Sequence, residues 1–140
     1  MRVAADYLAA GKRVIDLSAD FRLTSPDVYR AYYKSEPAAA GLMEHAVYGM
    51  PELFRDNIKD AKLIANPGCY VTASTLAIKP LLDAGMLLGS GIIIDAKSGV
   101  SGAGRSKNDA IYKYSEANEA MRVYGVGGVH RHTPEIEQNL

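Results

Sequence analysis

The chain has 140 residues and a formal net charge of zero, and 48% of its residues are hydrophobic. This mix is typical of a folded globular protein and excludes a disordered chain, which combines low hydrophobicity with high net charge. The balanced charge gives no basis for a nucleic-acid or anionic-membrane partner. A single Cys excludes an internal disulfide and a multi-cysteine metal site. No apolar run approaches the roughly 20 residues of a membrane span, so we expect a cytoplasmic protein with a reduced thiol.

The first part of the chain alternates helix and strand signals. Residues 1–10 have a helical pattern that Gly11 ends, because glycine readily adopts the left-handed conformation found at helix C-termini. Residues 13–18 predict a short strand. Ser25 followed by Pro26 predicts the start of the next helix, since serine caps helices and proline suits the first helical position.

The middle of the chain repeats this alternation. Residues 62–65 predict a strand that is stopped by the turn 66–68. A helical pattern covers residues 71–82, and Gly85 is its expected end. The β-branched run at 91–96 is typical of a buried strand.

The last part of the chain holds a glycine- and serine-rich loop over 98–106, a weak helical pattern over 108–117, and a clear helix start at Thr133. The predicted cap at Thr133 is followed by Pro134. That helix stops with the chain, and residue 1 opens directly into a helical pattern. We therefore expect this sequence to be a segment of a longer protein.

Cys69 is the first candidate for chemistry. The predicted strand, the turn 66–68 and the following helix place its thiol at a helix N-terminus. There the helix dipole and the free N–H groups favour the thiolate, which is the nucleophilic form. A buried Cys that packs as a small hydrophobic residue is the alternative interpretation, and these signals leave it open.

His130 and His132 are the second candidate. An H-x-H pair can ligate a metal ion, but no third ligand clusters with it, so we predict no metal site. His132 directly precedes the predicted cap of the last helix, where the dipole disfavours imidazolium and suits a neutral base. Glu135 and Glu137 act in the opposite direction, which leaves the net shift open. The alternative is a surface turn with capping histidines.

The glycine-rich loop is the third candidate, because its backbone amides could bind an anion. Gly99, four residues and Gly104 nearly match a P-loop, but Arg105 stands where that motif needs Lys. A nucleotide-binding module that uses Gly99 to Ser106 is thus one alternative function, and a plain glycine-rich turn is another. The first strand is not followed by G-x-G-x-x-G, so a complete dinucleotide fingerprint is absent.

Arg22 lies in a polar turn after the first predicted strand. Open α/β sheets bind ligands beyond the carboxyl ends of their strands. A guanidinium there can hold a phosphate group in a bidentate arrangement. The spacing by itself favours the alternative of a surface Arg paired to Asp20 or Asp27.

Five segments, taken together, resemble the N-acetyl-γ-glutamyl-phosphate reductases, a family of the aspartate-semialdehyde dehydrogenase superfamily. They occur in the family's order and span residues 14–22, 47–53, 65–70, 98–105 and 130–137. Pro-Gly-Cys-Tyr and His-Arg-His-Thr-Pro-Glu are the most specific. The resemblance implies an α/β fold: the later part of a Rossmann-type dinucleotide-binding domain over residues 1–67, joined to the start of an α+β catalytic domain over residues 68–140, both incomplete.

The resemblance also implies a reaction. It is the NADPH-dependent reductive dephosphorylation of N-acetyl-γ-glutamyl phosphate to the semialdehyde, a step of arginine biosynthesis. Cys69 corresponds to the nucleophile that expels phosphate and forms a thioester. His130 and His132 fall in the region that supplies the acid/base, and the helix-start argument favours His132. A lysine-pathway reductase acting on a carrier-linked acyl phosphate is the alternative within the superfamily.

Binding residues and partners follow from the same resemblance. The substrate and its phosphate are expected at Arg22, Arg105 and Glu135. NADP(H) is expected at Ser18, Pro67, Gly102 and Gly104. The partners implied are a small acyl phosphate and further copies of the protein, as a dimer or tetramer. The family's enzymes are well over twice this length, so this chain alone is expected to bind NADPH poorly and to be inactive.

Overall fold

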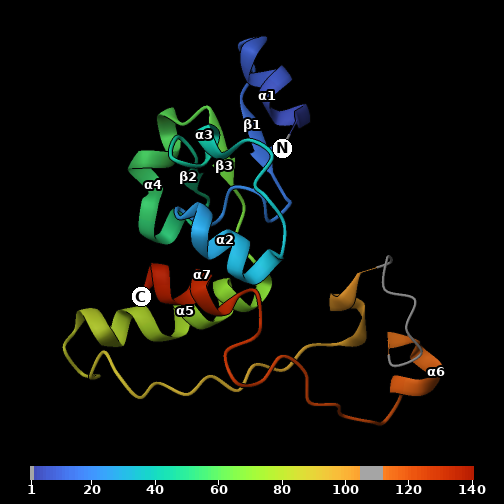
Figure 1. Cartoon of the computed structure of the whole chain (residues 1–140). Helices are drawn as coiled ribbons and strands as arrows, with labels where there is room; N and C mark the ends of the chain where they lie inside the picture. The colour runs from blue at the N-terminus through green and yellow to red at the C-terminus, as the bar shows by residue number, and fades with distance from the viewer. Residues whose placement is uncertain (1, 105–111) are drawn as a thin grey trace.

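The computed structural model describes residues 2–104 and 112–140. Figure 1 shows a small sheet with helices around it, a pair of helices (α5 and α7) beneath it, and a long irregular segment that runs out to one side. The elements are, in chain order, α1 (Arg2–Ala9), β1 (Val14–Asp16), α2 (Pro26–Tyr33), α3 (Ala40–Met43), β2 (Val47–Tyr48), α4 (Pro51–Asp60), β3 (Leu63–Ala65), α5 (Cys69–Asp83), η1 (Val100–Ala103), α6 (Tyr114–Ala117) and α7 (Thr133–Asn139).

The sheet is parallel, with strand order β1-β3-β2. Ile15 pairs with Ile64, and Tyr48 pairs with Ala65. The central strand β3 is buried along its whole length, as expected of a strand covered on both faces. Parallel strands need crossover connections, which α2 and α3 provide before β2 and α4 provides before β3. The carboxyl ends of all three strands therefore meet at one edge.

Local signals explain where the first helices begin and end. Gly11 has a φ of +73°, and Lys12 donates its backbone N–H to the Tyr7 carbonyl at 2.9 Å, which closes α1 as predicted. The Ser25 side chain accepts the Val28 N–H at 3.4 Å and caps α2. These predicted elements, and the predicted strands that became β1 and β3, are confirmed.

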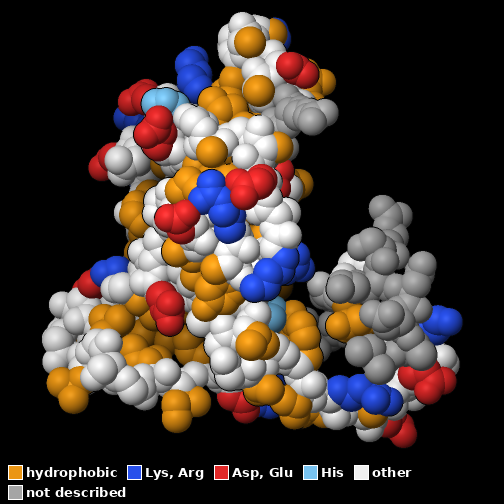
Figure 2. All heavy atoms as spheres, in the orientation of Figure 1, with side chains coloured by type: hydrophobic (Ala, Val, Ile, Leu, Met, Phe, Trp, Pro, Cys, Tyr) orange, Lys and Arg blue, Asp and Glu red, His pale blue; other side chains and the backbone are white. Residues whose placement is uncertain are grey.

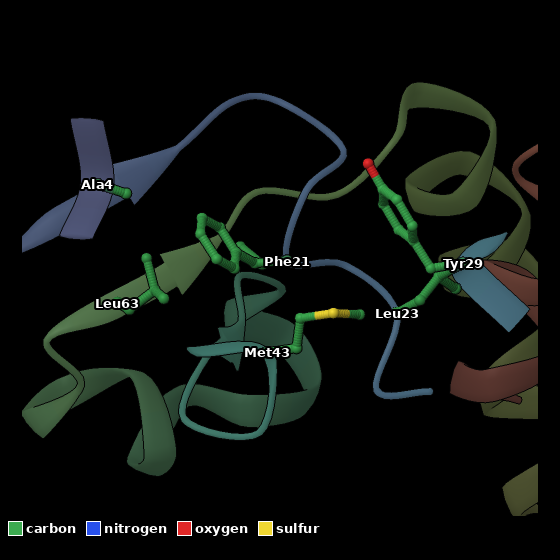
Figure 3. Close-up of a cluster of buried hydrophobic side chains, with 7 residues drawn as sticks. Ala4, Phe21, Leu23, Tyr29, Met43 and Leu63 are labelled. Atoms are coloured by element: carbon green, nitrogen blue, oxygen red, sulfur yellow. The ribbon is translucent and has the colours of Figure 1, made fainter. Parts of the chain in front are cut away.

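A hydrophobic core lies between the sheet, α1 and α2. Phe21, Leu23, Tyr29, Met43 and Leu63 belong to it (Figure 3), and each of them is at most 6% exposed. The loop that leaves β1 contributes Phe21 and Leu23, so this loop is fixed by packing. The polar residues on the same loop, Arg22 among them, are thereby held in place as well.

The lower pair of helices departs from expectation in one respect. The predicted helix 71–82 is α5, which begins two residues earlier and is followed by Gly85 with a φ of +67°. In α7, however, His132 and not Thr133 occupies the N-cap position, without a side-chain cap bond. The reason is that the His132 carbonyl already accepts the Ile136 N–H at 2.9 Å, so helical hydrogen bonding starts one residue sooner than predicted.

The predicted strand at 91–96 is wrong. These residues have no regular structure and are exposed, with Ile93 at 93%. A strand needs a neighbour to satisfy its backbone groups, and among the described residues only 14–16, 47–48 and 63–65 pair into a sheet. Figure 2 shows hydrophobic side chains on the surface of this lower part of the molecule.

The remaining sequence expectations fall partly outside the described residues. Of the weak helix predicted over 108–117, Tyr114–Ala117 form α6, and residues 108–111 lie outside the described residues, as does Arg105. In the described ranges, the helices are all too short or too polar to cross a membrane.

Candidate active site

The thiol of Cys69 stands at the start of α5. Strand β3 ends at Ala65, and the Asn66 N–H donates to the Asp16 carbonyl at 2.9 Å, which ties the turn to the end of β1. Gly68 is the N-cap, with extended φ and ψ, and Cys69 is the first helical residue. Its thiol is free and exposed. The interpretation of Cys69 as a buried packing residue is therefore wrong.

His132 packs against the residue that precedes Cys69. A Cβ on Gly68 would lie 2.6 Å from Cε1 and 2.8 Å from Cδ2 of the His132 ring, and closer still to Nε2. Only a glycine lets the imidazole approach this far. The rings of His130 and Tyr70 lie beside it, with centroids 4.8 Å and 5.8 Å from that of His132. The two most specific sequence segments are thus brought together.

His132 is neutral at neutral pH. Burial, followed by the charges of His130, Arg22 and Arg131, lowers its pKa from 6.5 to about 4. The net shift that the sequence left open is therefore downward. Its Nδ1 is buried and has no hydrogen-bond partner among the described residues. A neutral imidazole is the form that can accept a thiol proton, and this ring packs on the residue before Cys69.

His130 differs from His132 in that both of its ring nitrogens are engaged. Nδ1 accepts the backbone N–H of His132 at 3.0 Å, and Nε2 is bonded to the hydroxyl of Tyr124. With Nδ1 as an acceptor, the neutral ring carries its proton on Nε2. Burial and the charge of Arg131 lower the pKa of His130. The arrangement makes His130 a support for the turn that presents His132.

Glu135 is a buried carboxylate at the centre of the site, with 0% exposure. Its Oε1 accepts the Gly68 N–H at 3.0 Å and the Tyr48 hydroxyl at 2.6 Å. Its Oε2 lies 3.9 Å from Nη1 of Arg22. Burial and the neighbouring carboxylate raise the pKa of Tyr48, so the phenol stays protonated and acts as a donor. The predicted substrate-binding role of Glu135 stays a prediction.

Arg22 joins the ends of two strands. Its Nε donates to the Asn66 carbonyl at 2.7 Å and its Nη2 to the Leu17 carbonyl at 3.1 Å, and its side chain is 11% exposed. The interpretation of Arg22 as a surface residue paired to Asp20 or Asp27 is therefore wrong. Its binding of phosphate stays a prediction, as does that of Arg105, which lies outside the described residues.

The predicted cofactor residues fall in two places. Ser18 is exposed at the carboxyl end of β1, where its hydroxyl donates to Asp16 at 2.7 Å, and Pro67 lies in the adjacent turn. Gly102 lies in η1 and, together with Cys69 and both histidines, lines an open concave surface. A Cβ on Gly102 would meet the Ser98 hydroxyl, so this glycine serves close packing inside its own loop. Gly104 follows, with a φ of +76°.

Two family models match this chain and together cover most of it. Residues 1–61 match the NAD binding domain of semialdehyde dehydrogenase, and residues 69–140 match its dimerisation domain. The chain belongs to the semialdehyde dehydrogenase family. The expected α/β fold, a dinucleotide-binding part followed by the start of a catalytic part, is confirmed. The boundary at 67/68 stays a prediction.

Within this family, the chain is similar to proteins that carry a more specific name. This chain is 55% identical to the N-acetyl-gamma-glutamyl-phosphate reductase of Symbiobacterium thermophilum, 52% identical to that of Pelobacter propionicus and 51% identical to that of Thermus thermophilus. Each match covers the whole of this chain, and 40%, 40% and 39% of the respective relative. The chain therefore spans about 40% of the length of these relatives.

Sequence reasoning missed Tyr48. The segment 47–53 contributed to the resemblance, yet it suggested no role for this residue. Strand β2 has two residues, too few for an alternating pattern to be recognised. The glycine that follows Tyr48 could have indicated that this segment packs closely against another strand. A Cβ on Gly49 would lie 2.9 Å from Cγ2 of Ile64 and 3.0 Å from the Ala65 carbonyl oxygen, so the close approach of β2 to β3 requires glycine.

Proposed function

We propose that this chain is the part of an N-acetyl-γ-glutamyl-phosphate reductase that carries the reacting thiol and its acid/base. The names of the relatives support this assignment. The observation that carries it is the packing of the His132 imidazole on Gly68, next to an exposed Cys69 at a helix N-terminus. Arginine biosynthesis is the pathway that this substrate implies, and the cytoplasm is the proposed compartment because the thiol must remain reduced.

In the proposed reaction, His132 takes the proton of Cys69, and the thiolate attacks the acyl carbonyl of the substrate. A carbon–sulfur bond forms, the bond between the acyl carbon and the phosphate oxygen breaks, and phosphate leaves with the electron pair. The free N–H groups of the first turn of α5 stabilise the developing oxyanion. The product of this half-reaction is a thioester on Cys69.

NADPH, when bound, supplies the hydride that reduces the thioester carbonyl. The carbon–sulfur bond then breaks, the aldehyde is released, and Cys69 leaves as a thiolate that regains a proton from His132. We favour His132 over His130 for this role because both ring nitrogens of His130 are already engaged. A neutral imidazole is the form that can start the cycle as a base.

The residues of this chain fit one edge of a dinucleotide site. Ser18 and Pro67 lie at the carboxyl ends of β1 and β3, where open parallel sheets bind such ligands. We propose that they contact NADP(H) and that Gly102 and Gly104 lie by the nicotinamide. The match to a dimerisation domain supports assembly into a dimer or tetramer. The proposed domain boundary is 67/68, in the turn before the N-cap of α5.

Labelling of Cys69 tests the proposal directly. The enzyme that contains this chain is titrated with iodoacetamide while NADPH oxidation is followed with N-acetyl-γ-glutamyl phosphate. Activity should fall in proportion to the label on Cys69, and Cys69→Ser should lose several orders of magnitude in kcat, because a hydroxyl ionises far less than a thiol. Full activity after complete labelling contradicts the mechanism. Faster turnover of a carrier-linked acyl phosphate assigns the lysine pathway instead.

A further inference from the structure

We propose that Tyr48 is a positioning residue that acts through Glu135 to fix the turn before Cys69. Tyr48 lies on β2 within the segment that matches the NAD binding domain, whereas Glu135 lies on α7 within the segment that matches the dimerisation domain. The effect of Tyr48 on catalysis rests on the proposed function. Its effect on the position of the turn before Cys69 does not.

The geometry places one oxygen between two donors. Oε1 of Glu135 accepts the Tyr48 hydroxyl at 2.6 Å and the Gly68 N–H at 3.0 Å. Gly68 is the N-cap of α5, so its N–H belongs to the residue that sets the direction of the first helical turn. Tyr48, Glu135 and Gly68 thus form a continuous hydrogen-bonded path that ends one residue before the thiol.

The burial of Glu135 makes the orientation of its carboxylate depend on the donors around it. Glu135 has no exposed surface, and a carboxylate in such a place must be held by donors because its desolvation is costly. The ion-pair partner of Glu135 in the described part of the chain is Arg22, whose Nη1 is 3.9 Å from Oε2 and outside hydrogen-bond distance. Without the Tyr48 hydroxyl, the carboxylate gains by turning toward Arg22 and away from Gly68. The phenol therefore keeps Glu135 directed at the turn.

The same path affects the acid/base. The ring of His132 packs on Gly68, so a displacement of Gly68 changes both partners of the proton transfer. The backbone of Glu135 is anchored separately, since the Asn139 side chain donates to its carbonyl at 2.7 Å. The effect of Tyr48 is therefore confined to the Glu135 side chain and to what that side chain holds. A fully buried carboxylate is better suited to this role than to contact with substrate.

The decisive variant is Tyr48→Phe, which removes one hydroxyl and no carbon atoms. The matched control is Tyr29→Phe, because Tyr29 also donates to a carboxylate, at 3.3 Å from Asp20, but that carboxylate does not bond to Gly68. Both are made in the enzyme that contains this chain. Backbone amide exchange is measured by mass spectrometry on peptides spanning residues 66–70, and alkylation of Cys69 by iodoacetamide is timed at fixed pH.

Tyr48→Phe should raise exchange at this turn about 10-fold and lower the alkylation rate several-fold, whereas Tyr29→Phe should change neither. In the reductase assay, kcat should fall with KM nearly unchanged. Exchange equal to the unmodified enzyme overturns the proposal, and so does faster exchange with unaltered thiol reactivity. If these two measurements behave as expected but the unmodified enzyme shows no reductase activity, the proposed function fails and the positioning role stands.

A second pair of variants keeps the proposal testable if Tyr48→Phe does not fold. Glu135→Gln retains an oxygen that can accept from Gly68 and Tyr48, whereas Glu135→Ala retains none. Glu135→Gln should keep the exchange rate at 66–70 within about 3-fold of the unmodified enzyme, and Glu135→Ala should not. Equal losses in both variants show that the charge of Glu135 matters and the hydrogen bond does not, which overturns the proposal.

Discussion

The imidazole of His132 packs directly on the Cα of Gly68, two residues separated by more than 60 positions in the chain. This approach occupies the space where any other residue type would place its Cβ. It brings a neutral histidine to the residue that precedes Cys69 at the start of α5. The requirement for glycine at position 68 is thus a requirement of the site and does not come from backbone conformation, because the φ of Gly68 is −70°.

Gly68→Ala should destabilise the protein. The added Cβ would lie 2.6 Å from Cε1 of His132, so the ring or the turn must move, at a cost of about 1–3 kcal/mol. Urea unfolding followed by circular dichroism measures this change. The control is Gly41→Ala, because Gly41 lies in α3 and a Cβ there meets no atom within 4 Å. Gly41→Ala should be neutral or slightly stabilising, and equal losses at the two positions would contradict the packing argument.

The low pKa of His132 should make stability depend on pH between about 6.5 and about 4. In this window the unfolded chain binds a proton at His132 that the folded chain does not, so the free energy of unfolding falls as pH is lowered. Above about pH 6.5 and below about pH 4 its contribution is constant. Urea titrations of the unmodified protein and His132→Gln should show the smaller pH slope in the variant, and identical slopes would contradict the shift.

Arg22→Lys should weaken the sheet edge. The guanidinium donates to the carbonyls of Asn66 and Leu17 from two separate nitrogens, and one ammonium cannot reproduce this fork. We expect a loss of about 1–3 kcal/mol in the free energy of unfolding, because a part-buried carbonyl loses its donor. Arg30→Lys is the control, since Arg30 forms exposed ion pairs with Asp27 and Glu36 and should change stability little. A comparable loss in both variants would refute this account.

Ser25→Ala should cost about 0.5–2 kcal/mol, with the value near the lower end because the cap bond to the Val28 N–H is long, at 3.4 Å. Thermal unfolding measures the loss. Ser90→Ala, in the exposed segment after α5, is the control and should leave the midpoint unchanged. A Ser25→Ala protein with an unaltered midpoint would show that the cap contributes nothing to α2.

Sequence signals that act over a few residues predicted much of the fold. Ser25 and Pro26 at the start of α2, Gly11 after α1, and Cys69 at the start of α5 depend on neighbouring residues alone, and they are found as predicted. Helix α4 was missed because its N-cap, Met50, is not a capping residue type and makes no side-chain cap bond, although Pro51 at the first helical position and Glu52 in the first turn are helix-start signals. The run at 91–96 was wrong because β-branched residues favour a strand only where a neighbouring strand is present.

Some features of the candidate site could likewise be predicted from the sequence, and others could not. The sequence by itself determined the candidate groups, a cysteine at a helix start and a pair of histidines before a helix, because residue type and local spacing define them. Only the tertiary structure decided that His132 is neutral, that His130 is engaged at both nitrogens, and that Tyr48 and Glu135 hold the turn before Cys69. Each of these depends on burial or on hydrogen bonds to groups placed by the packing of α7 and its preceding turn against the sheet edge, which no local pattern encodes.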